Sequence, residues 1–120
     1  MDADEAGVVT ARKARGAATQ RIVAEWFRDR GWPYAIDAGA GRQGRDILNM
    51  VGLAPEVKAR REYSPTAWLR QAEANAAGDL PFVVHRPDGM GPATVHDWPV
   101  TIRLADFTDL LREAGYGDAL

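Results

Sequence analysis

The sequence of 120 residues predicts an α/β sandwich in which helices flank a mixed central β-sheet. Segments with the 3.6-residue apolar repeat of amphipathic helices alternate along the chain with short apolar segments typical of strands. Apolar residues make up 46% of the chain, which is enough for a core, and the length suits one domain. We therefore expect a single domain over residues 11–120 and a polar, acidic, mobile tail over residues 1–10.

The first helix is predicted over Ala11–Arg30. Four of its apolar residues form one stripe: Ile22, Val23, Trp26 and Phe27. Gln20 lies at the edge of this stripe, whereas Glu25 lies on the solvent side of the helix. Gly31 ends the helix.

Three short strands are predicted next, over Tyr34–Ala38, Asp46–Met50 and Glu56–Ala59. Gly52 and Pro55 lie between the last two, and a hairpin is the natural connection. The segment Gly39–Arg45 is predicted to be a flexible, basic, glycine-rich loop. Its glycines lack the spacing of a phosphate-binding loop and open no helix, so we expect no nucleotide cofactor.

The second half of the chain contains two further helices. One is capped by Ser64, has Pro65 in its first turn, and ends at Gly78. The remaining predicted elements are a buried strand over Pro81–His85, a loop over Arg86–Gly91, a last strand over Thr94–Leu104 broken at Pro99, and a helix over Ala105–Ala114.

Composition excludes several classes of protein. The chain has no cysteine, which excludes a disulfide scaffold, a thiol nucleophile and a thiolate zinc site. No apolar run approaches the ~20 residues of a membrane span, and residues 1–10 are acidic, unlike a signal peptide. We expect a soluble cytoplasmic protein without a membrane partner.

The charge is distributed unevenly along the chain. Residues 11–70 hold 12 Lys and Arg against six Asp and Glu, while the rest holds three basic and 11 acidic residues. A basic half favours a polyanionic partner such as DNA. The basic residues that we expect to contact DNA are Arg12, Lys13, Arg15, Arg42, Arg45, Arg60 and Arg61.

The segment from Asp46 to Lys58 carries the clearest chemical signal. Glu56 and Lys58 are two apart on a predicted strand and share a face, and the hairpin would bring Asp46 beside them. Two carboxylates that converge are typical of a site for a hard cation such as Mg²⁺. The alternative is a surface ion pair on an edge strand.

Several segments of the chain, including parts of this one, resemble a known family. They are Gly16–Arg21, Gly31–Pro33, Gly44–Ile47, Glu56–Lys58, the Trp68 helix, the strand Phe82–Val84 and the helix with Leu110 and Leu111. This arrangement resembles the PD-(D/E)XK nuclease superfamily and, more narrowly, the archaeal-type Holliday junction resolvases and their phage relatives. The resemblance implies a restriction-endonuclease-like sandwich.

The resemblance also implies a site and an activity. Asp46, Glu56 and the backbone carbonyl of Val57 would bind Mg²⁺, with Mn²⁺ as the alternative, and Lys58 would be catalytic. The protein would act as a homodimer that cuts two strands of a four-way DNA junction symmetrically.

This chain departs from the family at Gln20, where the resemblance implies a glutamate in the first helix. An amide can hold a water at the metal or bind the metal weakly, but it supplies no charge. We therefore expect a lower metal affinity. Other functions remain open: a nuclease of this fold with another DNA substrate, such as a repair nickase; a catalytically silent DNA-binding module; or an unrelated small α/β domain. His85 and His96 lack the spacing of metal ligands.

Overall fold

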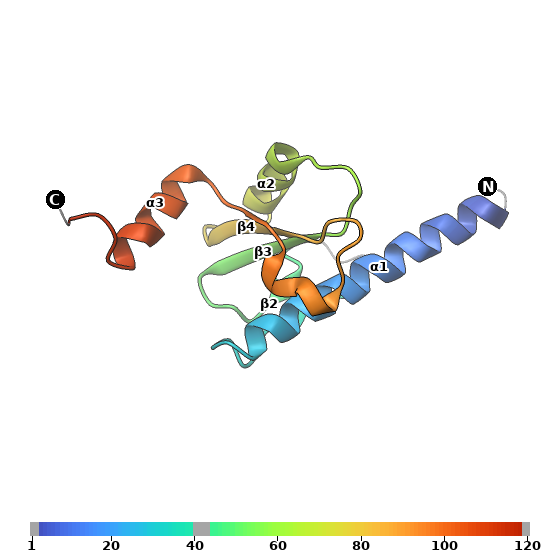
Figure 1. The fold of residues 1–120 in the computed structure, drawn as a ribbon, viewed down its shortest axis with the longest axis horizontal. Coiled ribbons are helices and arrows are strands. Elements are labelled where there is room, and N and C mark those ends of the chain that lie inside the picture. Colours follow the sequence, from blue (N-terminus) through green and yellow to red (C-terminus); the bar gives the residue numbers. More distant parts are fainter. Residues whose placement is uncertain (1–2, 40–43, 119–120) are drawn as a thin grey trace.

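The computed structural model describes residues 3–39 and 44–118. Along the chain, the elements are α1 (Ala3–Arg28), β1 (Ile36–Asp37), β2 (Ile47–Leu48), β3 (Leu53–Lys58), α2 (Pro65–Ala74), β4 (Leu80–His85), the 3₁₀-helix η1 (Pro92–Asp97), β5 (Val100–Thr101) and α3 (Leu104–Glu113) (Figure 1). The predicted α/β class with a mixed sheet is confirmed.

The main sheet has the strand order β3–β4–β5. Strands β3 and β4 are parallel, with Glu56 opposite Val83 and Lys58 opposite His85, whereas β5 runs antiparallel to β4. Strands β1 and β2 form a separate antiparallel pair. The parallel β3–β4 pair requires a crossover, and α2 provides it.

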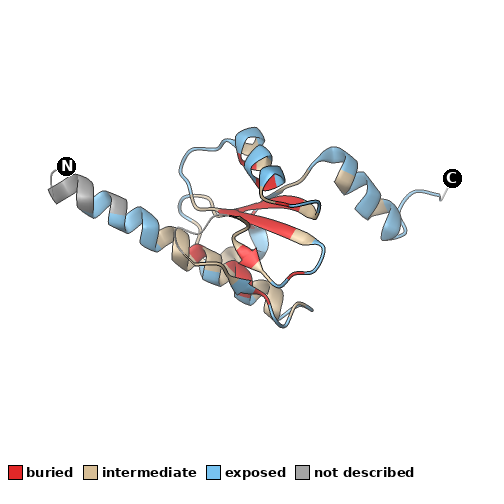
Figure 2. Ribbon diagram, turned by 180° about the vertical axis from the view of Figure 1, so that it is seen from behind, coloured by how far each residue is buried: buried red, intermediate tan, exposed pale blue. Residues whose placement is uncertain are grey.

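Helices α1 and α2 cover opposite faces of this sheet. Because successive side chains of a strand point to opposite faces, Val84 packs in one core with Val23 of α1, while Val83 packs in a second core with Trp68 and Ala72 of α2. Figure 2 shows the buried residues concentrated in the two long strands and in the part of α1 that faces them. Strand β3 therefore has a helix on each side, and it carries Glu56.

The first helix begins at Ala3 rather than at the predicted Ala11, so residues 3–10, predicted as part of a tail, are helical. No proline lies between these positions, and a helix that has already formed gains one hydrogen bond for each residue that it adds. The helix ends at Arg28, two residues before its predicted end, and Gly31 adopts a positive φ of 116° just beyond it.

The predicted hairpin is confirmed as a reversal of the chain, but its strand pairing is wrong. The N–H of Leu53 donates to the carbonyl of Met50 at 2.9 Å, which closes the turn, and Asn49 and Gly52 adopt positive φ there. However, the ladder partner of β2 is β1, not β3. The β1–β2 register places Ile36 opposite Leu48.

The predicted last strand over Thr94–Leu104, broken at Pro99, is confirmed only for the segment after the break. Its first half is η1, which has a proline at its N-terminus, and only Val100–Thr101 pairs with β4. Proline cannot donate to a ladder, so Pro99 contributes only its carbonyl, which accepts the N–H of His85 at 3.0 Å. Trp98, just before it, is buried in the core.

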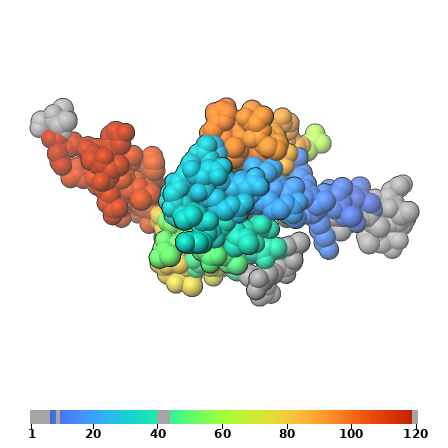
Figure 3. Space-filling model, turned by 90° about the horizontal axis from the view of Figure 1, so that it is seen from below, coloured from blue at the N-terminus to red at the C-terminus, as the bar shows by residue number. Residues whose placement is uncertain are grey.

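Helix α2 begins as predicted, with Ser64 at its N-cap and Pro65 in the first turn, but it ends at Ala74 instead of Gly78. Helix α3 agrees with its prediction to within one residue at each end. None of its residues is buried, and Leu104, Phe107 and Leu110 are exposed. Figures 1 and 3 show α3 projecting from the rest of the molecule. Within the described part of the chain, no helix has the length and apolar character that crossing a membrane requires.

Candidate active site

The chain reversal after β2 brings Asp46 to the edge of β3. The backbone N–H of Asp46 donates to the carbonyl of Pro55 at 3.1 Å, and its carboxylate accepts the backbone N–H of Val57 at 2.8 Å. These two bonds fix the Asp46 carboxylate against the strand that carries Glu56. The predicted convergence of Asp46 with the Glu56–Lys58 segment is therefore present in the structure.

Glu56 and Lys58 form an ion pair that is almost completely buried. The ammonium nitrogen of Lys58 lies 3.7 Å from Oε1 of Glu56, and the two side chains are 12% and 4% exposed. A pair this far from solvent is not the surface ion pair that was the alternative interpretation. Because burying charged groups is costly, the arrangement needs other partners to compensate the charges.

The Asp46 carboxylate disfavours the charge of Glu56, whereas Glu56 lowers the pKa of Asp46 as a hydrogen-bond partner. Burial and the nearby Asp46 carboxylate raise the pKa of Glu56 to about 7, although Lys58 and Asn75 oppose this shift. Burial also raises the pKa of Asp46, against the opposing effect of the Val57 N–H. A buried acidic pair of this kind is a good location for a cation, whose charge would replace a proton.

Two buried oxygen atoms of predicted site residues, one on Glu56 and one on Gln20, have no hydrogen-bond partner. Among the described residues, the buried side-chain polar atoms without a partner are Oε2 of Glu56, Oε1 of Gln20 and the indole nitrogen of Trp98. Such a group costs about 1–3 kcal/mol when it stays unpaired. The first two are acceptors on residues that the sequence predicted for this site, and oxygen atoms are the ligands that Mg²⁺ takes.

Arg86 connects the Gln20 region of α1 to the end of β3. Its backbone N–H donates to the carbonyl of Lys58 at 2.7 Å, and its guanidinium donates to the hydroxyl of Thr19 at 3.2 Å. Thr19 directly precedes Gln20, so this turn of α1 lies at the Lys58 end of the strand. Arg86 was not singled out from the sequence.

The carbonyl of Val57 points to the same edge of β3 as its N–H, because both groups of one strand residue leave from one side. That N–H meets Asp46, whereas the carbonyl of Lys58, the next residue, meets Arg86 on the opposite edge. The Val57 carbonyl is thus directed toward the Asp46 side. The two carboxylates and this carbonyl therefore fit the predicted Mg²⁺ ligands, whereas Gln20 lies on α1, which covers the face of the sheet opposite to the one that Glu56 and Lys58 share with α2.

Helix α2 supplies two amide side chains to the site. Oε1 of Gln71 accepts a hydrogen bond from the Lys58 ammonium at 2.6 Å, and the side chain of Asn75, the residue after α2, lowers the pKa of Glu56. The two amides are four residues apart and so lie on one side of the helix. Neither amide is among the residues that the sequence predicted for this site. Their i, i+4 spacing on a helix that follows the motif was the only available signal.

The basic residues predicted to contact DNA are placed differently from one another. Arg12 and Lys13 on α1, and Arg60 and Arg61 after β3, are exposed. The guanidinium of Arg15 lies 3.7 Å from the carboxylate of Asp88, and Arg42 lies outside the described residues.

Arg45 makes internal contacts. Its guanidinium donates to the carbonyls of Leu53 and Ala76 at 2.9 and 2.8 Å and pairs with Asp79 at 2.7 Å. These contacts join the start of β3 to the turn that precedes β4.

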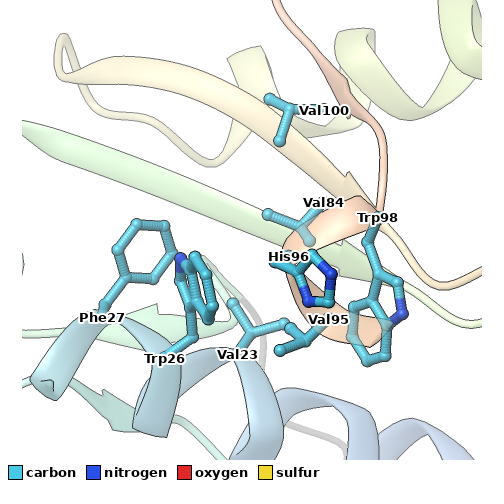
Figure 4. Close-up of a pocket in the computed structure, with 8 residues that line it drawn as sticks. All are labelled: Val23, Trp26, Phe27, Val84, Val95, His96, Trp98 and Val100. Atoms are coloured by element: carbon cyan, nitrogen blue, oxygen red, sulfur yellow. The ribbon is translucent and has the colours of Figure 1, made fainter. Parts of the chain in front are cut away.

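A separate apolar pocket of about 150 Å³ lies between α1, η1 and the β4–β5 edge. Figure 4 shows that its lining comes from residues such as Trp26, Val84 and Trp98, with the His96 ring at one side. None of the acidic pair, Lys58 or Gln20 lines it. The pocket is therefore distinct from the candidate active site.

Comparison of the chain with protein-family models, with curated proteins and with solved structures finds no match. Within the residues that the structure describes, no group of three or more His, Cys, Asp or Glu side chains could hold a metal ion. The site offers two carboxylates, so a cation there would complete its shell with carbonyl, amide or water oxygens, as Mg²⁺ commonly does.

Proposed function

We propose that this chain is a divalent-metal-dependent DNA endonuclease with a restriction-endonuclease-like sandwich, and that its substrate is a four-way junction cut symmetrically by a homodimer. The observation that supports the proposal most directly is the buried cluster of Asp46, Glu56 and Lys58 at one edge of β3. The exposed arginines that follow this strand favour a phosphate backbone as the ligand.

The side chains of the cluster have separable roles. Asp46 and Glu56 would hold Mg²⁺ together with the Val57 carbonyl. Bound there, Mg²⁺ would polarise the scissile phosphodiester and lower the pKa of the attacking water.

Lys58 is held in place for a role in the reaction. An ammonium has three donor hydrogens, of which one is donated to Gln71, while Glu56 lies 3.7 Å away as an ion-pair partner. A remaining hydrogen can donate to a phosphate oxygen and stabilise the negative charge that develops in the transition state. Lys58 supplies this charge at a fixed position, because its side chain is 12% exposed.

The test is incubation of labelled four-way junction, flap and duplex DNA with and without Mg²⁺ or Mn²⁺. We expect the wild type to cut the junction only with metal. Lys58→Ala should lose at least about 100-fold in cleavage rate but keep junction binding in Ca²⁺. Asp29→Ala, at an exposed position just after α1, is the control and should cut normally. Metal-independent cutting, or an unchanged Lys58→Ala rate, would contradict the proposal.

A catalytically silent DNA-binding module is the second candidate, and Gln20 is the observation that favours it. Gln20→Glu would supply the glutamate that the resemblance implies in the first helix. A wild type that binds the junction without cutting it, alongside an active Gln20→Glu variant, would identify a nuclease that has lost its activity. If neither protein cuts but both bind, the binding module is correct.

A further inference from the structure

Tyr63 is the exposed end of a stack of three aromatic rings. Its ring lies on the His85 ring, with centroids 5.4 Å apart and an interplanar angle of 26°, and it meets Trp68 edge-on at 5.7 Å. His85 and Trp68 are also in contact, at 4.9 Å, and both are buried. Tyr63 itself is 60% exposed. Two buried rings therefore support one ring that remains accessible to solvent.

The loop that carries Tyr63 is held at two points. The imidazole Nε2–H of His85 donates to the carbonyl of Arg60 at 3.0 Å, and the N–H of Trp68 donates to the carbonyl of Ser64 at 3.0 Å. These bonds lie on either side of Tyr63 in the sequence. The position of the ring is thus set before any ligand arrives, which lowers the entropic cost of binding.

Two exposed arginines, Arg60 and Arg61, precede Tyr63 in the same loop. An accessible aromatic ring next to guanidinium groups is the combination that binds unpaired nucleotides, because the ring stacks on a base and the cations meet the phosphates. Charge complementarity therefore selects a nucleic-acid strand as the ligand.

The stack lies close to the candidate active site. Trp68, which contacts Tyr63, is three residues before Gln71 on α2, and residues with this spacing are neighbours on a helix surface. Gln71 in turn accepts the hydrogen bond from Lys58. About one helical turn thus separates the aromatic stack from the residue that holds the lysine.

We propose that Tyr63 is a stacking platform for an unpaired DNA base, with Arg60 and Arg61 on the neighbouring phosphates. This inference rests on the proposed function for its choice of DNA as the ligand, and it adds a preference for unpaired bases beside the cleaved bond. Binding at the platform needs neither metal nor cleavage.

The test measures binding in EDTA of a single-stranded oligonucleotide that contains 2-aminopurine, a fluorescent base quenched by stacking. We expect wild type and Tyr63→Phe to quench the probe. Tyr63→Leu, which keeps an apolar cover over Trp68, should bind the strand at least about fivefold more weakly and quench less. Duplex affinity should stay unchanged in all three proteins.

Tyr34→Leu is the matched control, because Tyr34 is 78% exposed and lies before β1. It should behave like wild type. Circular dichroism and thermal unfolding establish that each variant is folded, and a Tyr63→Phe protein that binds like wild type shows that the ring carries the effect. Equal strand affinity in wild type and Tyr63→Leu would overturn the inference, and so would an equal loss in the Tyr34 control.

Failure of the stacking proposal can be distinguished from failure of the nuclease proposal. A protein that stacks the probe through Tyr63 but cuts no DNA would support the stacking platform and contradict the nuclease proposal. If the wild type cuts junctions and the Tyr63→Leu variant binds single strands as tightly as the wild type, only the stacking platform is contradicted.

Discussion

Glu56 is a carboxyl group whose charge is disfavoured by the folded structure. Its ordinary pKa of 4.5 rises to about 7, and the first cause is burial. Asp46, which shifts in the same direction, is the second cause. The folded protein therefore holds a proton here that the unfolded chain releases at lower pH.

From this shift we predict that the metal-free protein becomes less stable as the pH rises from about 4.5 to 7. In this range the folded state binds more protons than the unfolded state, so the free energy of unfolding falls with pH, by up to about 3 kcal/mol from Glu56. Urea unfolding in EDTA at several pH values measures this slope.

Glu56→Gln should remove that part of the pH dependence, whereas Glu62→Gln, at an exposed position, should keep it. Equal slopes for wild type and Glu56→Gln would contradict the predicted pKa. Adding Mg²⁺ to the wild type at pH 8 should raise its melting temperature, because an ion that binds only the folded state stabilises it.

Arg45 connects two parts of the fold, because its guanidinium joins the start of β3 to the α2–β4 turn. The sequence placed this residue among the DNA contacts. Its side chain is only 21% exposed, and its hydrogen bonds are made inside the protein. Its contacts are those of a residue that stabilises the fold.

We predict that Arg45→Ala lowers the free energy of unfolding by about 2–3 kcal/mol, since it removes charged hydrogen bonds to two carbonyls and one carboxylate. Chemical denaturation provides the measurement. Arg61→Ala, at an exposed site, should change stability by less than about 0.5 kcal/mol. A similar effect of both variants would show that the internal contacts contribute little.

At the scale of the whole molecule, α3 is the element that the rest of the described chain leaves exposed. Leu104, Phe107 and Leu110 give it an apolar side, yet none of its residues is buried (Figure 3). An exposed apolar helix of this kind is typical of an interaction surface. A second copy of the chain is the partner that the proposed symmetric cleavage requires.

We therefore predict that Phe107→Glu combined with Leu110→Glu converts a dimer to a monomer, as measured by size-exclusion chromatography with light scattering. Asp109→Arg is the control, because residue 109 lies on the opposite side of the helix. A wild type that is monomeric at micromolar concentration, or a double variant that remains dimeric, would show that α3 is not the dimer interface.

The residues of the candidate site were predictable because their signal is local. Glu56 and Lys58 share a face of one strand by the two-residue repeat, and a short reversal with Asn49 and Gly52 brings Asp46 to them. The amides of Gln71 and Asn75 were not predictable in the same way. Their contact with the site depends on how α2 packs against β3, which involves residues distant in the sequence.

The sequence by itself determined the α/β class, the positions of α2, β4 and α3, and the spacing that brings the acidic pair to Lys58, since apolar periodicity and turn residues act over a few neighbours. Only the tertiary structure decided that β2 pairs with β1, that η1 replaces half of a predicted strand, that Arg45 is internal and that Tyr63 stands on two buried rings. These features depend on contacts between segments far apart in the chain. The free energy of such contacts comes from burial and hydrogen bonding in the assembled fold, so no local pattern encodes them.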